Sequence, residues 1–320
     1  MEIPLKNRTI ETIDQKFMNS PSPIQLYHPE HWKEYELIDC GNFEKLERFG
    51  NITTIRPEPQ AIWDKSFPES EWKKQAHAKF IGISSSSGKW EMTQNCPENW
   101  EMNYHHEKLN LNFNLSLTKF KHVGIFPEQA VNWDYISNGI HQLKKEGIQT
   151  PKFLNLFAYT GGASIAAKQA GADVTHVDAV RQIISWSKRN MESSNLRDIR
   201  WVVEDAVTFV KRELKRGNTY NGIILDPPAF GRGPNGESWK LEDDINELLK
   251  NVLRLLSPNH SFFILNTYSL GFSSLIPDNI LKQELSALKI KPKEYEIGEL
   301  FLKDSFEKNL PLGVLVRFKL

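Results

Sequence analysis

The segment Phe153-Leu-Asn-Leu-Phe-Ala-Tyr-Thr-Gly-Gly-Ala163 decides the fold of this chain. Its first five residues are mostly apolar and typical of a strand, and the paired glycines then open a short helix that ends before Gly171. The turn lacks both the Gly-x-Gly-x-x-Gly pattern of dinucleotide-binding folds and a following Gly-Lys-Ser/Thr. A phosphate-binding loop is therefore excluded, and nicotinamide binding is disfavoured.

The same alternation of strand and helix continues along the second half of the chain. Strands are predicted at residues 174–177, 199–203, 222–225 and 261–265, and helices at 163–170, 181–193, 206–216 and 241–256. Single helices between strands imply parallel neighbours joined by right-handed crossovers. Residues 294–297 and 313–318 are expected to pair as a hairpin at the sheet edge. The sequence thus predicts an α/β fold with a doubly wound sheet.

The first half of the chain has a different character. Five of the nine tryptophans in the whole chain lie before residue 122, among short apolar stretches interrupted by Pro, Gly and Asn. Residues 109–117 alternate apolar and polar side chains, which is typical of a half-buried strand, and residues 46–55 predict two strands around Gly50-Asn51. Residues 84–88 are expected to form a loop. We therefore expect a β-rich α+β domain over residues 1–122 and a catalytic domain over residues 123–320.

Composition and charge exclude several classes of protein. The 320 residues include 40 Lys and Arg against 40 Asp and Glu, so the formal net charge is zero. This balance excludes a broadly basic nucleic-acid binder but leaves room for a local basic groove. Cys40 and Cys96 have no metal-ligand spacing, so neither a disulfide framework nor a bound metal is expected. The polar first residues and strand-length apolar runs predict a cytoplasmic protein without a membrane segment.

Aspartates follow three of the predicted parallel strands. Asp178, Asp205 and Asp226 come directly after strands, where a doubly wound sheet binds its ligands. A carboxylate at this edge can accept both hydroxyls of a ribose or the amino group of an adenine. The alternative for Asp178 and Asp205 is the capping of the helix that follows.

The segment Asp226-Pro-Pro-Ala-Phe230 is the most specific indication of a ligand-binding site in this part of the sequence. Two consecutive prolines fix φ and remove donors, so the backbone after the strand is stiff. A carboxylate, rigid carbonyl groups and an aromatic face together can hold a planar amine by hydrogen bonds and stacking. The alternative is a proline-rich turn without a ligand.

Together these features resemble the class I S-adenosylmethionine-dependent methyltransferases. The stretches His122-Val-Gly-Ile-Phe-Pro-Glu-Gln-Ala-Val-Asn-Trp-Asp134 and Leu154-Asn-Leu-Phe-Ala-Tyr-Thr-Gly-Gly162, followed by Val177-Asp178, narrow the resemblance. They are similar to bacterial large-subunit (23S) ribosomal RNA methyltransferases, a subfamily that includes cytosine-C5 and guanine-N7 enzymes. The resemblance covers residues 120–320 and implies a seven-stranded Rossmann-like sheet.

The resemblance also implies the cofactor, S-adenosylmethionine, and the residues that bind it. Asp178 would bind the ribose and Asp205 the adenine. The methionine part would be lined by Ala158, Tyr159, Gly161 and Gly162, and Phe126 and Gln129 would close over the cofactor. Asp226, Pro227 and Phe230 would face the target base as the catalytic residues.

One departure from this subfamily bears on the reaction. Cytosine-C5 methylation needs a nucleophile on C6, which a cysteine in the loop after the fifth strand normally supplies. That loop reads Asn266-Thr-Tyr-Ser-Leu-Gly271, with Tyr268 near the position of the cysteine. We therefore expect direct in-line transfer to a nitrogen or oxygen, in which positioning provides most of the rate.

The expected substrate is a base of large-subunit ribosomal RNA. Two alternatives stay open: a methyltransferase of a protein or small molecule, and an inactive RNA-binding assembly factor. Trp239 is the preferred candidate for stacking on a base, ahead of Trp90 and Trp100. Basic residues that could follow a phosphate backbone cluster at Lys188-Arg189, Arg197, Arg200, Lys211-Arg212 and Lys215-Arg216.

Overall fold

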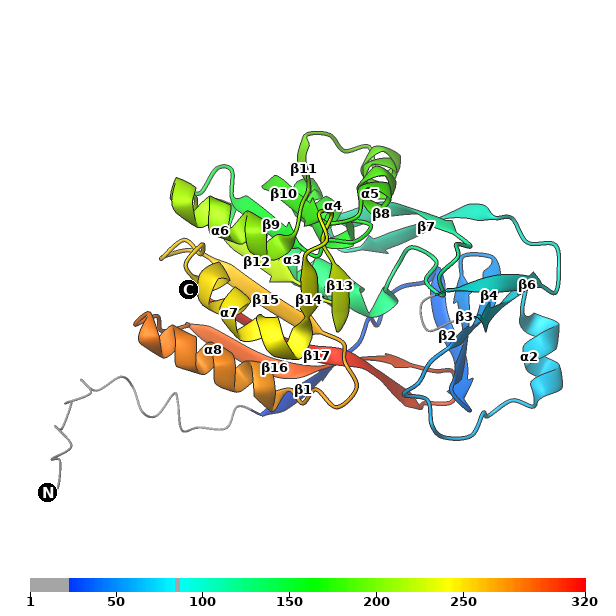
Figure 1. The fold of residues 1–320 in the computed structure, drawn as a ribbon. Helices are drawn as coiled ribbons and strands as arrows, with labels where there is room; N and C mark the ends of the chain where they lie inside the picture. Colours follow the sequence, from blue (N-terminus) through cyan, green and yellow to red (C-terminus); the bar gives the residue numbers. More distant parts are fainter. Residues whose placement is uncertain (1–22, 84–86) are drawn as a thin grey trace, which may run out of the picture.

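The computed structural model describes residues 23–83 and 87–320. Within them, eight strands form a central sheet in the order β1-β16-β17-β15-β12-β9-β10-β11 (Figure 1). The strands are β1 (Ile24–Tyr27), β9 (Lys152–Leu156), β10 (Asp173–Asp178), β11 (Ile199–Val203), β12 (Gly222–Leu225), β15 (Phe262–Thr267), β16 (Glu294–Lys303) and β17 (Asn309–Lys319). The five strands from β15 to β11 pair in parallel, and β17 runs antiparallel to both of its neighbours.

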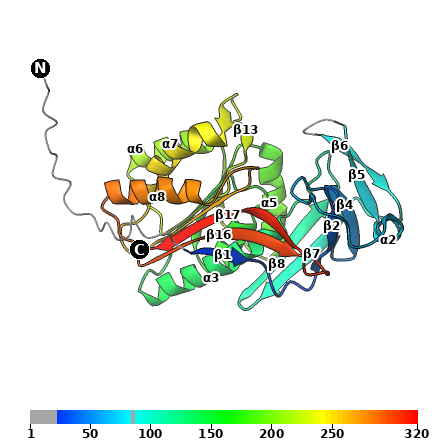
Figure 2. The same cartoon turned by 90° about the horizontal axis from the view of Figure 1, so that it is seen from below.

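Helices cover both faces of this sheet, so the predicted doubly wound α/β fold is confirmed (Figure 2). One face carries α3 (Ala130–Lys145), α4 (Gly162–Gln169) and α5 (Arg181–Ser193), and the other carries α6 (Ala206–Arg216), α7 (Leu241–Leu253) and α8 (Leu275–Ala287). Adjacent residues of one strand enter different cores: Phe262 packs with the first set of helices and Phe263 with the second. This burial on both faces explains why the strands are apolar without alternation.

The outer part of the sheet differs from the prediction. The two tail segments do pair as a hairpin, β16 and β17, but β17 lies between β15 and β16. The edge position belongs to β1, which comes from the other end of the chain and pairs in parallel with β16. β1 has four residues and its side chains are largely exposed, so no periodic pattern marked it in the sequence.

A smaller sheet and one helix form a second layer of structure in the first half of the chain. The sheet contains, in order, β2 (Tyr35–Gly41), β3 (Glu44–Phe49), β4 (Ile52–Pro57), β5 (Ala78–Gly82) and β6 (Gly88–Met92). The helix is α2 (Glu69–Gln75), whose Trp72 closes a separate small core with Leu46 and Ile55. The two strands predicted around Gly50-Asn51 are confirmed as β3 and β4. Of the loop predicted at 84–88, residues 84–86 lie outside the described residues.

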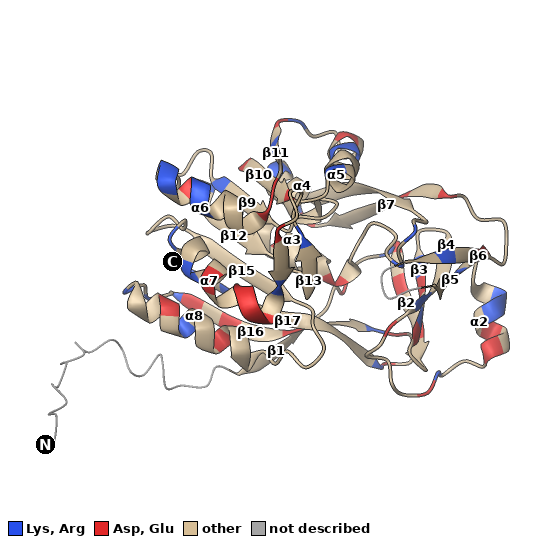
Figure 3. Ribbon diagram, viewed as in Figure 1, with Lys and Arg blue, Asp and Glu red and all other residues tan. Residues whose placement is uncertain are grey.

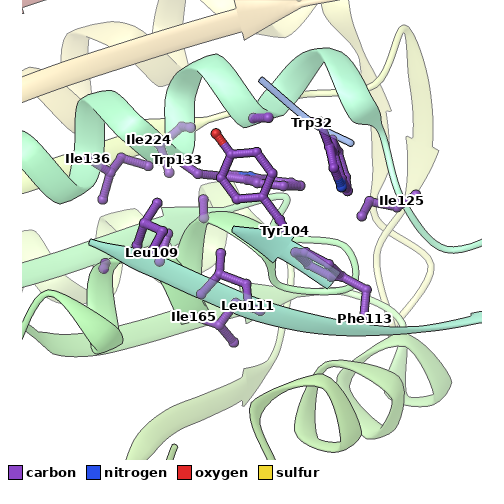
Figure 4. Packing of buried hydrophobic residues seen from close by; sticks show 14 of the residues in the cluster. Trp32, Tyr104, Leu109, Leu111, Phe113, Ile125, Trp133, Ile136, Ile165 and Ile224 are labelled. Carbon is purple, nitrogen blue, oxygen red and sulfur yellow. The ribbon is translucent and has the colours of Figure 1, made fainter. Parts of the chain in front are cut away.

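The hairpin of β7 (Asn99–His106) and β8 (Leu109–Ser116) joins the first half to the central sheet. The predicted strand at 109–117 is confirmed as β8. Tyr104 and Phe113 of the hairpin pack on Trp133 of α3, with ring centroids 5.3 and 5.0 Å apart, and Trp32 completes the cluster (Figure 4). β1 belongs to the central sheet through its pairing with β16, and the hairpin shares the core on one face of that sheet. The boundary at residue 122 stays a prediction.

In residues 23–83 and 87–320 no helix has the length and apolar character that crossing a membrane requires.

Candidate active site

A pocket lies at the carboxyl ends of β9 and β12, where the sequence analysis expected the ligand. Seven of the eleven predicted site residues line it together: Phe126, Gln129, Ala158, Tyr159, Gly161, Gly162 and Asp226. Asp178 adjoins the pocket through the backbone of Tyr159, whereas Asp205, Pro227 and Phe230 are not part of the pocket wall.

The loop after β9 holds two side chains in a strained conformation. Phe157 and Tyr159 both have positive φ, at 56° and 48°, which costs free energy for residues with bulky side chains. Three hydrogen bonds hold the loop in this shape. From α5, Ser187 Oγ donates to Tyr159 O (2.7 Å) and Asn190 Nδ2 to Thr160 O (2.9 Å), and Thr160 Oγ1 of the loop donates to Gly124 O (2.7 Å). Helix α5 and the segment with Gly124 thus hold this wall of the pocket in place.

Packing within the protein explains why glycine is needed at residues 161 and 162. Gly161 has φ +89°, and a Cβ there would lie 3.3 Å from Cβ of Ser187. A Cβ at Gly162 would lie 2.7 Å from the ring of Trp133. Side chains at these two residues would therefore meet α5 and α3.

Asp178 is anchored and still able to accept further hydrogen bonds. Its Oδ2 accepts from Tyr159 N and its Oδ1 from Val180 N, both at 2.9 Å. Burial raises the pKa of this carboxyl, and the two backbone bonds oppose the rise. Each oxygen keeps a second lone pair, which is the arrangement needed to accept the two hydroxyls of a ribose.

Asp205 has the capping role that the sequence analysis left as the alternative. It is the N-cap of α6, and its Oδ2 accepts from Thr208 N at 2.8 Å. Its role toward an adenine stays a prediction.

A chain of side-chain amides orients Asp226. Gln129, on the short 3-10 helix η1 (Pro127–Gln129), donates through Nε2 to Oδ2 of Asp226 at 2.9 Å. Asn132 Nδ2 donates in turn to Oε1 of Gln129 at 2.7 Å and reaches Oδ1 of Asn266 at 3.4 Å. Since the oxygen of Gln129 is occupied by Asn132, its NH2 group must face Asp226. Asp226 also accepts a hydrogen bond from the side chain of Asn266, so two amides hold its carboxylate.

The pKa of Asp226 is raised to about 7, mainly by burial and then by the charge of Glu128, while a hydrogen bond from Asn266 opposes the rise. Glu128 is itself buried, which raises its pKa to about 7 against the opposing charge of Lys45. The charge of Glu128, which is not itself part of the pocket wall, thus acts on Asp226 from behind it.

The small N-terminal sheet brings buried charges to the same side. Arg56 donates through Nε and Nη2 to Oε2 of Glu47, at 2.9 and 2.6 Å. Lys45 lies 3.3 Å from Glu58, and Glu58 Oε1 accepts from the hydroxyl of Tyr268 at 2.7 Å. This last bond joins the sheet directly to the loop after β15.

The segment after β12 separates its predicted residues. Pro227 is buried, whereas Phe230 is 62% exposed on a hairpin of β13 (Phe230–Arg232) and β14 (Ser238–Lys240). Trp239 of β14 is buried, contrary to the prediction that it stacks on a base. Its Nε1 donates to Pro228 O at 2.7 Å and its ring packs 5.0 Å from Phe157, so it fixes the hairpin to the strained loop.

No thiol lines the pocket among the described residues. Cys40 is fully buried in β2 with its Sγ 3.4 Å from Asp304, and Cys96 lies between β6 and β7. Tyr268, near the expected position of a catalytic cysteine, pairs with Pro228 as an isolated parallel bridge.

Three of the eight basic residues in the predicted cluster are paired with glutamates. Arg212 is bonded to Glu204, and Arg216 and Arg200 lie 2.9 and 3.9 Å from Glu213. The Lys and Arg residues at the end of α6 lie on the side of the molecule away from the small N-terminal sheet (Figure 3).

Sequence reasoning missed several residues of the site. Trp133, Asn155 and Thr160 line the pocket, and Glu128 acts on Asp226 through its charge. Glu128 and Trp133 lie within the stretch 122–134 that carried the resemblance, so this stretch was the available signal.

The strand order and this pocket define a class I S-adenosylmethionine-dependent methyltransferase. The comparison with protein families agrees. The chain belongs to the S-adenosylmethionine-dependent methyltransferase family, whose model matches residues 84–288. The protein is therefore an enzyme that takes its methyl group from S-adenosylmethionine.

Similar proteins are found among curated sequences and solved structures. Ribosomal RNA large subunit methyltransferase K/L of Shewanella frigidimarina is 31% identical over 164 residues, 50% of this chain and 22% of that protein. The protein of that name from Magnetococcus marinus is 28% identical over 192 residues, 57% of this chain and 25% of that protein. The match thus spans no more than about a quarter of these relatives.

A solved structure covers nearly the whole chain. The SAM-dependent methyltransferase of Agrobacterium tumefaciens is 33% identical with a TM-score of 0.84, covering 93% of this chain and 95% of that one. A putative SAM-dependent methyltransferase from Streptococcus mutans, 18% identical with a TM-score of 0.67, covers 91% and 76% and shares the fold.

The residues of the pocket fit this cofactor. Asp178 presents two anchored carboxylate oxygens, which suits a ribose. The rings of Phe126 and Tyr159 lie 5.1 Å apart in the pocket wall, and aromatic faces attract a sulfonium cation. The bound cofactor supplies an electrophilic methyl group, and the carboxylate of Asp226 lines the same pocket.

Proposed function

We propose that this enzyme methylates a nitrogen of a nucleobase in large-subunit ribosomal RNA. The observation that carries the proposal is the arrangement after β12. Asp226 lies in the cofactor pocket, and Phe230, four residues later in the chain, is exposed. A carboxylate that accepts from an amino group and a ring that stacks on the base are what a planar amine substrate requires.

The role proposed for Asp226 is to orient the amino group and to take its surplus proton. Gln129 and Asn266 hold the carboxylate, and a lone pair that they leave open accepts from the substrate nitrogen. When that nitrogen gains a methyl group it must lose a proton, and a carboxyl with a pKa of about 7 can accept it near neutral pH. In-line transfer of this kind needs no covalent intermediate, which agrees with the positions of Cys40 and Cys96.

Support for an RNA substrate comes from the relatives, which are named for methylation of large-subunit ribosomal RNA. The same proposal includes three further roles: Phe126 and Gln129 cover the cofactor, Asp205 binds the adenine, and Pro227 contacts the target base. It also includes a cytoplasmic location for the enzyme.

The test uses S-adenosylmethionine with a labelled methyl group and an extract from cells that lack this gene. We expect label in the RNA of the large subunit, and after digestion an N-methylated nucleoside. Label in protein or in a small molecule would contradict the RNA substrate. A 5-methylcytidine product would contradict direct transfer to nitrogen.

A further inference from the structure

A short loop beside the pocket is held rigidly while its central ring is left in solvent. Residues 118–122, here called the rim loop, connect β8 to η1. Three of its carbonyl oxygens accept hydrogen bonds from the small N-terminal sheet: Thr118 O from Trp90 Nε1 (2.8 Å), Lys119 O from Gly88 N (2.9 Å) and Lys121 O from Arg56 Nη1 (3.2 Å). The backbone of the rim loop is therefore fixed by its neighbours.

The side chains of the rim loop combine an exposed aromatic ring with cations. Phe120 is 59% exposed, so this rigid loop holds an apolar ring in contact with solvent. Lys119 is exposed and Lys121 half-buried, and within the described chain neither has a carboxylate at ion-pair distance. Burial lowers the pKa of Lys121, and its Nζ reaches Pro57 O at 3.4 Å.

The rim loop lies next to the active site. The ring of His122 is 4.9 Å from the ring of Phe126, which lines the pocket. Phe120 precedes His122 by two residues, so their Cα atoms are at most about 7 Å apart. The hairpin β13–β14, with exposed Phe230 and Arg232, follows Asp226 of the same pocket.

We propose that the rim loop is a binding surface for single-stranded RNA beside the target base, with Phe120 stacking on a neighbouring base and Lys119 and Lys121 binding phosphates. This inference rests on the proposed RNA substrate and adds the place and strandedness of its binding. An aromatic face between cations matches the alternation of base and phosphate along one strand. A protein partner would require a wider apolar surface than one ring between two lysines.

The rim loop is favoured over the basic helices because it lies beside the pocket. The ring of His122 is 4.9 Å from the ring of Phe126 in the pocket wall, whereas Arg200, Arg212 and Arg216 of the helices are paired with glutamates.

The experiment measures binding of a fluorescein-labelled single-stranded RNA of 20 nucleotides and mixed sequence to the full chain loaded with S-adenosylhomocysteine. Phe120→Ala is expected to weaken binding by about ten-fold or more, and Phe120→Trp to preserve it. Lys119→Ala is expected to lower the slope of log K against log salt by about 0.7.

Leu26→Ala is the matched control. Leu26 is 61% exposed but lies on β1, four strands away from β12, or about 19 Å across the sheet. The Leu26→Ala variant should bind the RNA with the affinity of the wild type. Unchanged affinity of S-adenosylhomocysteine in every variant confirms that each one folds.

The possible failures are distinguishable. If the wild-type enzyme methylates RNA but Phe120→Ala and Lys119→Ala bind as it does, the rim loop is not the surface and the proposed function stands. Equal competition by a duplex of the same sequence would overturn the preference for a single strand. No binding of RNA and no methylation of RNA by the wild type would overturn both proposals.

Discussion

Asp226 combines two properties that oppose each other: it is largely shielded from water in the pocket, and it must be ionised to accept a proton. Burial and the neighbouring charge of Glu128 raise its pKa to about 7. The enzyme therefore keeps a fraction of this residue protonated at neutral pH, which makes its ionisation the expected control on the reaction rate.

The first prediction concerns pH. Methyl transfer should increase as pH rises through about 7 and level off above, because the anionic form of Asp226 is the one that accepts a proton. Single-turnover rates between pH 5.5 and 9 measure this. Asp226→Asn should lower the rate by at least 100-fold and leave the affinity for S-adenosylmethionine within a few fold. A profile without a rise in this range would contradict the assignment.

Gln129 gives a second prediction. Its amide stabilises the anion of Asp226, so Gln129→Ala should raise the pKa of Asp226 further and move the rise in rate to higher pH by about one unit. Gln142→Ala is the control, since Gln142 makes a similar bond to exposed Glu146 on α3. A large loss of cofactor affinity with an unmoved pH profile would instead assign Gln129 to the cofactor.

The third prediction separates the two strand-end aspartates. Asp178→Asn should weaken binding of S-adenosylmethionine by more than ten-fold, because an amide offers one acceptor where the ribose needs two. Asp205→Ala should lower the free energy of unfolding by about 1 kcal/mol through loss of the cap. Asp205→Ser keeps a capping oxygen and so preserves the stability of α6. Titration calorimetry of S-adenosylmethionine with this variant therefore measures the contribution of the carboxylate to cofactor binding, separate from its role as a cap.

The amide chain also shows what a sequence can reveal about a site. Gln129 and Asp226 are 97 residues apart in the chain, and no local pattern pairs them. The segment after each strand could be predicted, because its position at the sheet edge follows from the alternation of elements. Which atoms meet there depends on how α3 packs against the sheet.

At the level of elements, local periodicity predicted α5, α6, β11 and β12 with their observed bounds. Periodicity gave wrong predictions where tertiary contacts determine whether a residue is buried. Trp239 looked exposed in a polar segment, but the carbonyl of Pro228 and the ring of Phe157 bury it. α8 was missed, although its buried Leu281 and Leu285 show the spacing of four that marks a helical face.

The contact of α3 with α4 supports a fourth prediction. Gly162→Ala would place a Cβ 2.7 Å from the ring of Trp133, which is packed on both sides and cannot retreat. We expect a loss of about 1–3 kcal/mol in the free energy of unfolding and a weaker affinity for S-adenosylmethionine. Gly231→Ala is the control, because a Cβ there meets nothing nearer than 3.5 Å.

At the scale of the whole molecule, the small N-terminal sheet is bound to the central sheet at two distant places. Near the active site, Glu58 of the loop after β4 accepts from Tyr268. Farther out, Lys308 at the β16–β17 turn bonds to buried Asp39 of β2 at 2.8 Å. The bond between Glu58 and Tyr268 connects two parts of the molecule. One is the small N-terminal sheet, which holds the rim loop, and the other is the loop after β15, which contains Tyr268.

Tyr268→Phe tests whether this link couples the two parts. It removes one hydrogen bond to a charged group, so the midpoint of thermal unfolding should fall by several degrees. Hydrogen exchange should increase both in β4 and in residues 266–271, because each loses its partner across the interface. Tyr220→Phe is the control: its hydroxyl bonds to Glu213 inside the catalytic half, so the added exchange should stay near α6 and β12. If Tyr268→Phe alters exchange only in residues 266–271, the small sheet is held by its other contacts, and Glu58 does not transmit its position to the pocket.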